Sequence, residues 1–390
     1  MISVTQALDH LFALVEPLGN ESVLLRHAAG RFLAEPVQAQ RTQPPFAASS
    51  MDGYAIKSVE AQQHAQFKVI GEAAAGHGFK GIVRAGQAVR IFTGAPVPEG
   101  ADFVVIQEDT SRSGDLITLT ETDFHKDNIR PAGADFSAGD PFAPAHALRP
   151  NDIALLAAMN HGQINVRRKP VVALIPTGDE LVQPGEDPGV DQIIASNSYG
   201  LAALLEANGA EPRLLPIARD DANSLRTAFQ MAQSADLIVT IGGASVGDHD
   251  LVAPVAADLG MDQSFYKIAM RPGKPLMAGR LGETAMVGLP GNPVSAMVCG
   301  TIFILPMIRV MLGQPAKAAT RITRSLAHDI PANGPREHYM RAHLDNAGAH
   351  VFERQDSALL NVLSQSNALC VRPPHDPARQ AGEVLEFILI

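Results

Sequence analysis

Three short loops that contain glycine each follow an apolar stretch of the chain, and their residues suit the binding of an anion. They are Pro176-Thr177-Gly178-Asp179-Glu180, Gly242-Gly243-Ala244-Ser245-Val246-Gly247-Asp248 and Leu289-Pro290-Gly291-Asn292-Pro293. Glycine lets backbone N–H groups approach a ligand, and the N-terminus of a following helix favours negative charge. A single loop of this kind is also common in ordinary tight turns. Three of them at the carboxyl edge of one sheet predict a ligand site.

Pairs of acidic residues fall at the ends of predicted strands and could hold a divalent cation. They are Asp179 and Glu180, Asp220 and Asp221, and Asp248 and Asp250. Mg²⁺ binds through one or two carboxylates together with the phosphate oxygens of a substrate, so these residues predict a magnesium site. The structural alternative is helix capping, which Asp221 and Asp248 could both provide.

Three cations, Lys267, Arg271 and Lys274, fall within eight residues of a chain whose net charge is −10. Arginine offers a planar fork and lysine a compact charge, so the segment is interpreted as a clamp for an oxyanion or phosphate. The alternative is a solvated charged strand.

Two further loops carry a polar side chain in an apolar, glycine-containing setting. Ser49 to Ala55 surrounds Asp52, and Phe92 to Asp102 begins with Thr93. By residue type alone each is equally an ordinary turn. The 13 histidines show neither a catalytic-triad spacing nor a metal-binding spacing.

The elements around the three glycine loops have the pattern of an α/β domain. Apolar strands are expected at 171–175, 213–217 and 236–241, with helices from about Ser198 to Glu206 and from a cap near Asp221. Strands that alternate with helices predict a parallel sheet covered on both faces. The loops that follow such strands meet at one edge of the sheet, which is where the acidic pairs also fall.

The rest of the chain is predicted to contain short strands and a few helices. An N-terminal amphipathic helix has a capping box of Ser3 and Gln6. Short strands are expected at 67–70, 88–92, 103–107, 116–119, 163–166, 338–342, 350–353 and 383–390, and a helix at 151–160. These textures divide the chain into an elongated N-terminal or linker domain (1–45 and 138–168), a small β-rich domain (46–137), an α/β domain (169–316) and a C-terminal β-barrel-like domain (317–390).

Composition places the chain among globular proteins, with 46% hydrophobic and 18% charged residues. The net charge of −10 argues against a nucleic-acid partner, which requires clustered basic residues. The long apolar run from Val294 to Leu312 is interrupted by polar residues and a proline, so a buried core helix is expected rather than a membrane span. Cys299 and Cys370 form no Cys-x-x-Cys pair, and no signal pattern opens the chain. A cytoplasmic location is therefore expected.

Seven segments, in this order along the chain, carry a family resemblance. They are Ser50-Met51-Asp52-Gly53-Tyr54-Ala55, Thr93-Gly94-Ala95-Pro96-Val97-Pro98-Glu99-Gly100, Asn128-Ile129-Arg130, Thr177-Gly178-Asp179-Glu180-Leu181, Gly242-Gly243 followed by Ser245-Val246-Gly247-Asp248, Arg271-Pro272-Gly273-Lys274-Pro275 and Leu289-Pro290-Gly291-Asn292-Pro293-Val294-Ser295. With them the chain resembles the molybdopterin molybdenumtransferase family, whose eukaryotic relatives include the C-terminal domain of gephyrin. The resemblance covers nearly the whole chain and is weakest after Gln314.

This resemblance implies an elongated multidomain chain of the α/β plus β class, with a central three-layer α/β molybdopterin-binding domain and small β domains. It implies a homodimer whose site lies between the α/β domain of one subunit and the small β domain of the other. The implied substrates are adenylylated molybdopterin and molybdate, with Mg²⁺, and the implied products are molybdenum cofactor and AMP. Tungstate fits the residues equally well, and the adenylyltransferase that supplies the activated pterin is a possible partner.

The family's important positions fall on particular residues of this chain. Catalytic roles are expected for Asp52, Glu180, Asp250, Lys267 and Lys274, and metal binding for Asp179, Glu180, Asp220 and Asp221. Ligand binding is expected for Thr93, Gly242, Gly243, Ser245, Gly247, Asp248, Arg271, Pro290, Gly291, Asn292, Pro293 and Ser295, and Asp135 is also a family position. Two departures stand out. Arg271 replaces a frequent lysine, and Ala195-Ser196-Asn197-Ser198 lacks one acid and one base that the family usually has there.

Two other functions remain open from the sequence. One is the adenylyltransferase that makes the activated pterin on the same kind of α/β domain, against which the extra β domains and the Asp52 loop argue. The other is a dimeric scaffold that gathers partner proteins. Glu180, Asp250, Lys267 and Lys274 would have no purpose in a purely structural protein, so they disfavour the scaffold.

Overall fold

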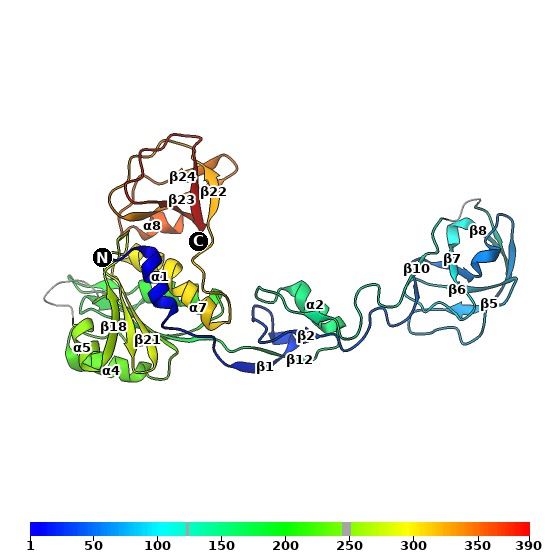
Figure 1. The fold of residues 1–390 in the computed structure, drawn as a ribbon, viewed down its shortest axis with the longest axis horizontal. Coiled ribbons are helices and arrows are strands. Elements are labelled where there is room, and N and C mark those ends of the chain that lie inside the picture. Colours follow the sequence, from blue (N-terminus) through cyan, green and yellow to red (C-terminus); the bar gives the residue numbers. More distant parts are fainter. Residues whose placement is uncertain (122–124, 244–250) are drawn as a thin grey trace. The chain divides into compact units, whose positions relative to one another are not determined.

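The computed structural model describes residues 1–121, 125–243 and 251–390, which form a mixed α/β multidomain chain with two compact units (Figure 1). The larger unit contains Met1–Glu21 and Arg167–Ile390, and the smaller one contains Ser22–Val166. Four residues of the predicted site, Ser245, Gly247, Asp248 and Asp250, lie outside the described residues.

A six-stranded sheet forms the centre of the α/β part of the larger unit. Its strands, in spatial order, are β16 (Glu211–Leu214), β13 (Val171–Pro176), β17 (Leu237–Ile241), β21 (Thr284–Leu289), β20 (Met277–Leu281) and β18 (Met261–Tyr266). The first four are parallel, and their apolar sequences match strands that are buried on both faces. Strand β16 begins two residues before the predicted position and ends earlier.

The three predicted strands of this sheet are parallel, whereas β18 and β20, which the sequence pattern did not predict, run antiparallel to their neighbours. Only residues 282 and 283 connect β20 to β21, and Gly282 adopts a φ of +58° in this turn. A connection of two residues can join only antiparallel strands, because a parallel pair needs a long crossover.

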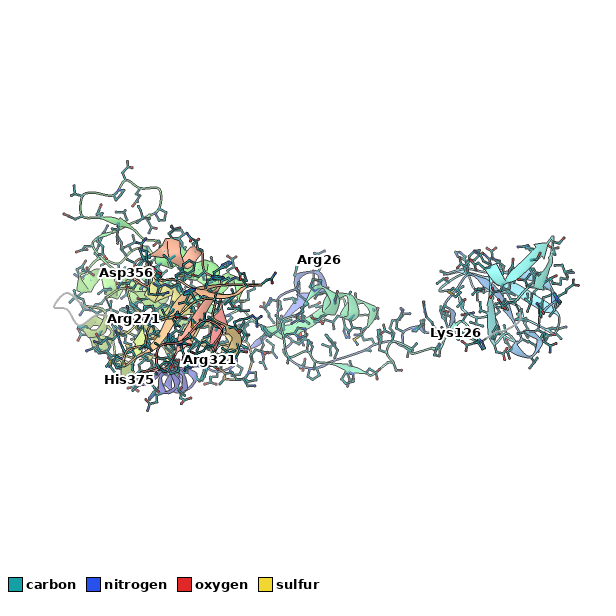
Figure 2. All side chains as sticks on the ribbon, turned by 90° about the horizontal axis from the view of Figure 1, so that it is seen from above. Arg26, Lys126, Arg271, Arg321, Asp356 and His375 are labelled. Carbon is teal, nitrogen blue, oxygen red and sulfur yellow. The ribbon has the colours of Figure 1, made fainter. Side chains whose placement is uncertain are left out.

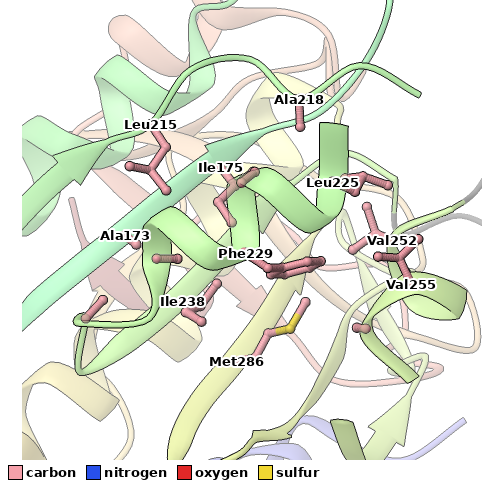
Figure 3. Close-up of a cluster of buried hydrophobic side chains, with 14 of the residues drawn as sticks. Ala173, Ile175, Leu215, Ala218, Leu225, Phe229, Ile238, Val252, Val255 and Met286 are labelled. Atoms are coloured by element: carbon pink, nitrogen blue, oxygen red, sulfur yellow. The ribbon is translucent and has the colours of Figure 1, made fainter. Parts of the chain in front are cut away.

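One face of this sheet is covered by α4 (Ala222–Ala232) and α5 (Val252–Asp258), whose apolar side chains meet those of the strands (Figure 3). Phe229 of α4 is central to this cluster and is 2% exposed. Helix α4 begins at Asp221, whose Oδ1 accepts hydrogen bonds from the backbone N–H groups of Asn223 and Ser224, both at 2.9 Å. The capping role predicted for Asp221 is confirmed.

The long apolar run is a continuous helical segment made of α6 (Pro293–Cys299), a π-helical turn (Gly300–Ile304) and α7 (Leu305–Met311). It is long and apolar enough to cross a membrane, yet 83% of its most apolar window is buried within the protein. The prediction of a core helix is therefore confirmed. Helix α3 (Asn197–Ala207) packs against α6, and a Cβ on Gly300 would lie 2.6 Å from a methyl group of Leu201. Glycine allows this close packing.

The N-terminal helix α1 (Val4–Phe12) has the predicted capping box, in which Ser3 and Gln6 bond to each other's backbone N–H groups. Just before it, the N–H of Ile2 donates to the carbonyl of Lys267 at 3.3 Å. The start of the chain is thereby attached to the cationic segment.

A second six-stranded sheet occupies the C-terminal part of the larger unit. Its order is β19 (Met270–Arg271), β23 (Glu337–Asp345), β25 (Ala368–Arg372), β26 (Val384–Leu389) and β22 (Ile322–Ser325), with β24 (Gly348–Val351) also paired to β23. The predicted strands of this region are confirmed within a few residues. Strand β19 does not come from the C-terminal part of the chain. It belongs to the cationic segment and pairs in parallel with β23.

The smaller unit contains a third six-stranded sheet, as the β-rich texture predicted. Its order is β7 (Phe103–Ile106), β4 (Gly53–Ile56), β6 (Gln87–Ile91), β5 (Gln66–Ala73), β9 (Leu116–Leu119) and β8 (Thr110–Ser113). Short pairs join β3 (Ala48–Ser49) to β10 (Ile129–Arg130), β2 (Val37–Gln38) to β11 (Pro141–Phe142) and β1 (Asn20–Leu24) to β12 (Gln163–Arg167). The predicted helix is α2 (Pro150–Ala158).

Candidate functional site

A cavity of about 620 Å³ lies at the carboxyl ends of β13, β17 and β21. The last residues of the first two strands, Pro176 and Ile241, are in its wall, and Pro290 follows the third strand. The predicted site residues that line it are Glu180, Asp220, Gly242, Gly243, Pro290, Gly291, Asn292 and Pro293. The structure thus brings all three glycine loops to one cavity, at the edge where open α/β sheets bind ligands.

Main-chain hydrogen bonds between the three loops hold them together. The N–H of Thr177 donates to the carbonyl of Ile241, and the N–H of Gly242 donates to the carbonyl of Leu289, both at 3.0 Å. These bonds extend the pairing of β13, β17 and β21 one residue beyond the sheet. They fix the spacing of the three chain segments where the loops begin.

Glycine is required at two positions of the second loop. Gly242 and Gly243 adopt φ values of +99° and +59°, which L side chains rarely adopt. A Cβ on Gly242 would also lie 2.7 Å from the carbonyl oxygen of Thr177, and one on Gly243 would overlap Val252. Any other residue at these two positions would strain the backbone and clash with Thr177 or Val252.

The side chain of Glu180 folds back over its own loop. Gly178 has a φ of +143°, and a Cβ at this position would overlap the carboxylate of Glu180. The Glu180 carboxylate therefore lies directly over Gly178, in the space that a side chain would take. Glu180 is exposed and lines the cavity with Asp220, so two carboxylates border the same space.

The remaining acidic residues have structural partners. The N–H of Asp179 donates to Asp220 at 3.4 Å, and the N–H of Asp220 donates to Asp179 at 3.2 Å, which joins the two loops. Asp221 is the helix cap described above. Within residues 1–121, 125–243 and 251–390, no group of three or more His, Cys, Asp or Glu side chains is arranged to hold a metal ion. Glu180 and Asp220 match the one or two protein carboxylates that Mg²⁺ uses beside a substrate phosphate.

Asn197 connects the third loop to helix α3. Its side-chain amide donates to the carbonyl of Gly291 at 2.7 Å. The neighbouring departures from the family pattern, Ala195 and Ser198, are both buried beside it. Apolar side chains of Leu181, Ile193 and Ile194 form another part of the cavity wall.

None of the three cations, Lys267, Arg271 and Lys274, lines the cavity. Their segment contributes only Pro275 to the cavity wall. The N–H of Lys267 donates to the carbonyl of Leu276, and the N–H of Ile268 donates to that of Lys274, both at 3.0 Å. These bonds close the segment into a hairpin-like loop. Arg271 and Lys274 are exposed, and Arg271 is labelled in Figure 2.

Two basic residues that sequence reasoning did not single out lie next to Arg271. His338 is directly opposite Arg271 in the β19–β23 pair, and Arg341 follows on the same strand. Arg341 is fully buried and His338 is 5% exposed. Nε and Nη1 of Arg341 and Nε2 of His338 have no hydrogen-bond partner among the described residues. Nη2 of Arg341 donates to the backbone carbonyl of Asp356 at 2.9 Å, so the guanidinium is partly satisfied and an anion would complete its hydrogen bonding.

Their ionisation agrees with a strongly positive environment. Burial and the charge of Arg271 lower the pKa of Arg341 to about 10. Burial, followed by Arg271 and Arg341, lowers the pKa of His338 to about 3. This cluster has little signal in the sequence, because basic residues on a strand of mixed polarity are normally exposed.

The smaller unit carries the other predicted polar pair. Oδ1 of Asp52 accepts hydrogen bonds from both the backbone N–H and the hydroxyl of Thr93, each at 2.8 Å. These two bonds, and then the charge of Arg90, lower the pKa of Asp52 despite some desolvation. The loop therefore presents a half-exposed, ionised carboxylate. Asp135 is in the same unit and is exposed, whereas Ser295 is buried in α6 of the larger unit and does not line the cavity.

Comparison with known protein families agrees with this arrangement over most of the chain. Residues 2–160 match the model of the MoeA N-terminal region (domain I and II). Residues 173–310 match a probable molybdopterin binding domain, and residues 323–390 match the MoeA C-terminal region (domain IV).

Individual relatives match over comparable lengths. A protein of a Nostoc species named molybdopterin molybdenumtransferase is 36% identical over 96% of this chain and 90% of its own length. One of the same name from Haemophilus influenzae is 37% identical over 80% of this chain and 78% of its own. The crystal structure of the molybdopterin biosynthesis moeA protein from Pyrococcus horikoshii OT3 matches all of both chains, with 28% identity and a TM-score of 0.87. On these similarities, the chain belongs to the molybdopterin molybdenumtransferase family.

Proposed function

We propose that this protein inserts molybdate into adenylylated molybdopterin and releases AMP, which yields molybdenum cofactor. The observation that carries the proposal is the cavity at the carboxyl ends of β13, β17 and β21, where three glycine loops meet Glu180 and Asp220. The relatives that share this architecture are named for molybdenum transfer to molybdopterin.

The cavity suits a nucleotide-linked pterin in its size and its wall. A volume of about 620 Å³ is in the range of cavities that enclose a compound of this size. Leu181, Ile193 and Ile194 offer an apolar surface to a flat ring. Helix α6 begins directly after the third loop, and its N-terminus would favour the negative charge of a phosphate.

Cleavage of a phosphoric anhydride requires correct positioning and charge stabilisation more than a covalent intermediate. Mg²⁺ held by Glu180 and Asp220 would neutralise negative charge on the phosphate oxygens. The Glu180 carboxylate lies over Gly178, and the Asp220 carboxylate accepts a hydrogen bond from the backbone N–H of Asp179. These positions support a role in binding Mg²⁺. Asp52 would supply an ionised carboxylate that accepts a hydrogen bond or a proton from the substrate.

Molybdate would bind at the cationic segment as a substrate. Lys267, Arg271 and Lys274 supply exposed or partly exposed positive charge, and Arg341 supplies a buried guanidinium with two free donors among the described residues. A planar guanidinium together with the compact charges of lysine suits the several oxygens of a tetrahedral oxyanion.

We also propose a domain organisation, a homodimer and a cellular location for this protein. The four domains would be 1–45 with 138–168, 46–137, 169–316 and 317–390, and the α/β domain would have three layers. Two copies would form a homodimer, in which the Asp52 loop of one copy serves the cavity of the other. The enzyme would work in the cytoplasm, which the two free thiols of Cys299 and Cys370 suit.

The decisive experiment is incubation of the purified protein with adenylylated molybdopterin, Mg²⁺ and molybdate. We expect AMP and active cofactor to form together, and both to require molybdate. Release of pyrophosphate from ATP and free molybdopterin would identify the adenylyltransferase instead. If the folded protein released neither AMP nor pyrophosphate, a scaffold function would be favoured.

Gly178→Ala should reduce AMP release on the order of tenfold to a hundredfold, because the new methyl group displaces the Glu180 carboxylate. Gly185→Ala is the matched control. Gly185 also has a positive φ, of +93°, but a Cβ there meets nothing within 4 Å. Both variants place a Cβ on a residue with positive φ, whereas only Gly178→Ala displaces the Glu180 carboxylate. Equal activity of the two variants would contradict the proposed position of Glu180.

Lys274→Ala and Arg341→Met should weaken molybdate binding with different dependence on salt. Lys274 is exposed, so the loss should be largest at low ionic strength, where its Coulomb attraction is least screened. Arg341 is buried, so its loss should reduce affinity at every salt concentration. Calorimetric titration with molybdate measures both, with the exposed Lys317→Ala as control. Arg341→Met should change the melting temperature little, because removal of a buried charge offsets the loss of its hydrogen bond to the Asp356 carbonyl.

A further inference from the structure

Arg90 has a conspicuous setting in the smaller unit. It lies on β6 directly opposite Tyr54 of β4. Its guanidinium is 5.1 Å from the centre of the Tyr54 ring and 4.7 Å from that of Phe92. Contacts between a cation and two aromatic rings restrict the guanidinium to one plane. Arg90 is half-buried, and the sequence analysis assigned no role to it.

The same guanidinium bonds to both sides of the Asp52 loop. Nη1 of Arg90 donates to the carbonyl of Gly53 at 3.1 Å, and Nη2 donates to Oε1 of Gln107 at 2.6 Å. The backbone N–H of Gln107 in turn donates to the carbonyl of Asp52 at 3.0 Å. Arg90 therefore links Gly53, the residue after Asp52, to Gln107, whose N–H bonds to the Asp52 carbonyl.

The partner of the Asp52 carboxylate comes from the same strand. Thr93 lies three residues after Arg90, just beyond the end of β6, and it supplies both hydrogen bonds to Oδ1. The pairing of Gly53 with Ile91 sets the spacing of β4 and β6, and Arg90 adds a connection across β4 to Gln107, on the other side of the Asp52 loop. Among the described residues, Arg90 is also the charged group that acts on the pKa of Asp52, after the two Thr93 bonds.

We infer that Arg90 is a positioning residue, which clamps the Asp52 loop to β6 so that Thr93 can hold the carboxylate in one orientation. The inference rests on the proposed function, in which the ionised Asp52 acts on the substrate. Loss of the clamp would act in two ways. The carboxylate would sample other orientations, and its pKa would rise because the Thr93 bonds and the positive charge are both weakened.

The sign of the pH effect follows from that change. The pKa of Asp52 lies below its ordinary value in the intact loop. A higher pKa means that the carboxylate is protonated at a higher pH, so the acid limb of the activity profile moves upward. A purely structural role for Arg90 would lower the amount of folded protein and leave the position of this limb unchanged.

The test compares Arg90→Gln and Arg90→Lys with Arg112→Gln in the full-length protein. Arg112 lies on β8 of the same sheet, and its Nε donates to the carbonyl of Gly114 at 2.9 Å. Two quantities are measured for each variant: the Asp52 carboxyl titration by NMR, and kcat and KM for AMP release as functions of pH.

For Arg90→Gln we expect kcat to fall on the order of tenfold to a hundredfold with little change in KM. The Asp52 titration and the acid limb should both move to higher pH. Arg90→Lys keeps the charge but loses the planar fork of the guanidinium. It should therefore restore part of the lowering of the Asp52 pKa but little of kcat. Arg112→Gln should resemble the wild type.

The inference fails if Asp52 titrates as in the wild type in both Arg90 variants, or if only the folded fraction changes. If Arg90→Gln does not fold, the titration of Asp52 in Arg90→Lys still decides the question. Because the NMR titration needs no turnover, it remains valid if the protein proves inactive. A wild type that releases no AMP would overturn the proposed function, whereas a normal Asp52 in the variants would overturn only the role of Arg90.

Discussion

Glu180→Gln should fold like the wild type and release AMP on the order of a hundredfold to a thousandfold more slowly. Glu180 is exposed, so the change should alter the free energy of unfolding by less than about 0.5 kcal/mol. Its carboxylate borders the cavity beside Asp220, and the amide keeps its shape but lacks the negative charge. Removal of one preorganised electrostatic group typically has an effect of this size on turnover.

Thermal melting and single-turnover AMP release should therefore separate in this variant. Glu206→Gln is the matched control, because Glu206 is an exposed glutamate on α3 of the same unit and does not line the cavity. A loss of activity that follows an equal loss of folded protein would show that Glu180 is structural. An active Glu180→Gln would remove this residue from the proposed mechanism.

Mixing two inactive variants should restore activity if the proposed homodimer has composite sites. Asp52→Ala and Lys274→Ala each damage one half of the proposed site, and these residues belong to different units of the chain. In a mixed dimer, one of the two symmetry-related sites would contain two intact halves. Random exchange gives about half mixed dimers with one intact site each, so recovery should approach roughly a quarter of the wild-type rate.

Subunit exchange has to be verified by mass spectrometry of the mixed sample. Exchange without any recovery would mean that each site is built from a single chain. Recovery well above a quarter would also contradict the scheme, since it would require that one of the single variants is itself active.

The meeting of the three glycine loops could be predicted because it follows from the main chain. Apolar strands such as 171–175 can only be central strands of a covered sheet, and parallel strands bring the loops at their ends together. The requirement for glycine at 242 and 243 is also local, because it comes from positive φ values within the loop itself. The capping role of Asp221 is local in the same way.

The features that sequence reasoning missed depend on contacts between distant segments. The buried environment of Arg341 exists only because β19 leaves the α/β part and pairs with β23, about seventy residues later in the chain. Nothing near residue 341 in the sequence signals that pairing. The reversal of β20 had a local signal, Gly282 in a two-residue turn, which a search for alternating strands and helices passes over. The functional roles of the predicted residues remain proposals.

The pairing of β19 with β23 limits the modularity of this protein. Residues 270 and 271 are encoded within the α/β stretch but are hydrogen-bonded as a strand of the C-terminal sheet. Excision of the α/β domain at residue 316 would therefore leave the backbone around Arg271 without its ladder partner and expose the apolar side of the segment. In evolution, the C-terminal sheet could not be lost or exchanged without rebuilding the cationic segment, so the two parts are expected to be inherited together.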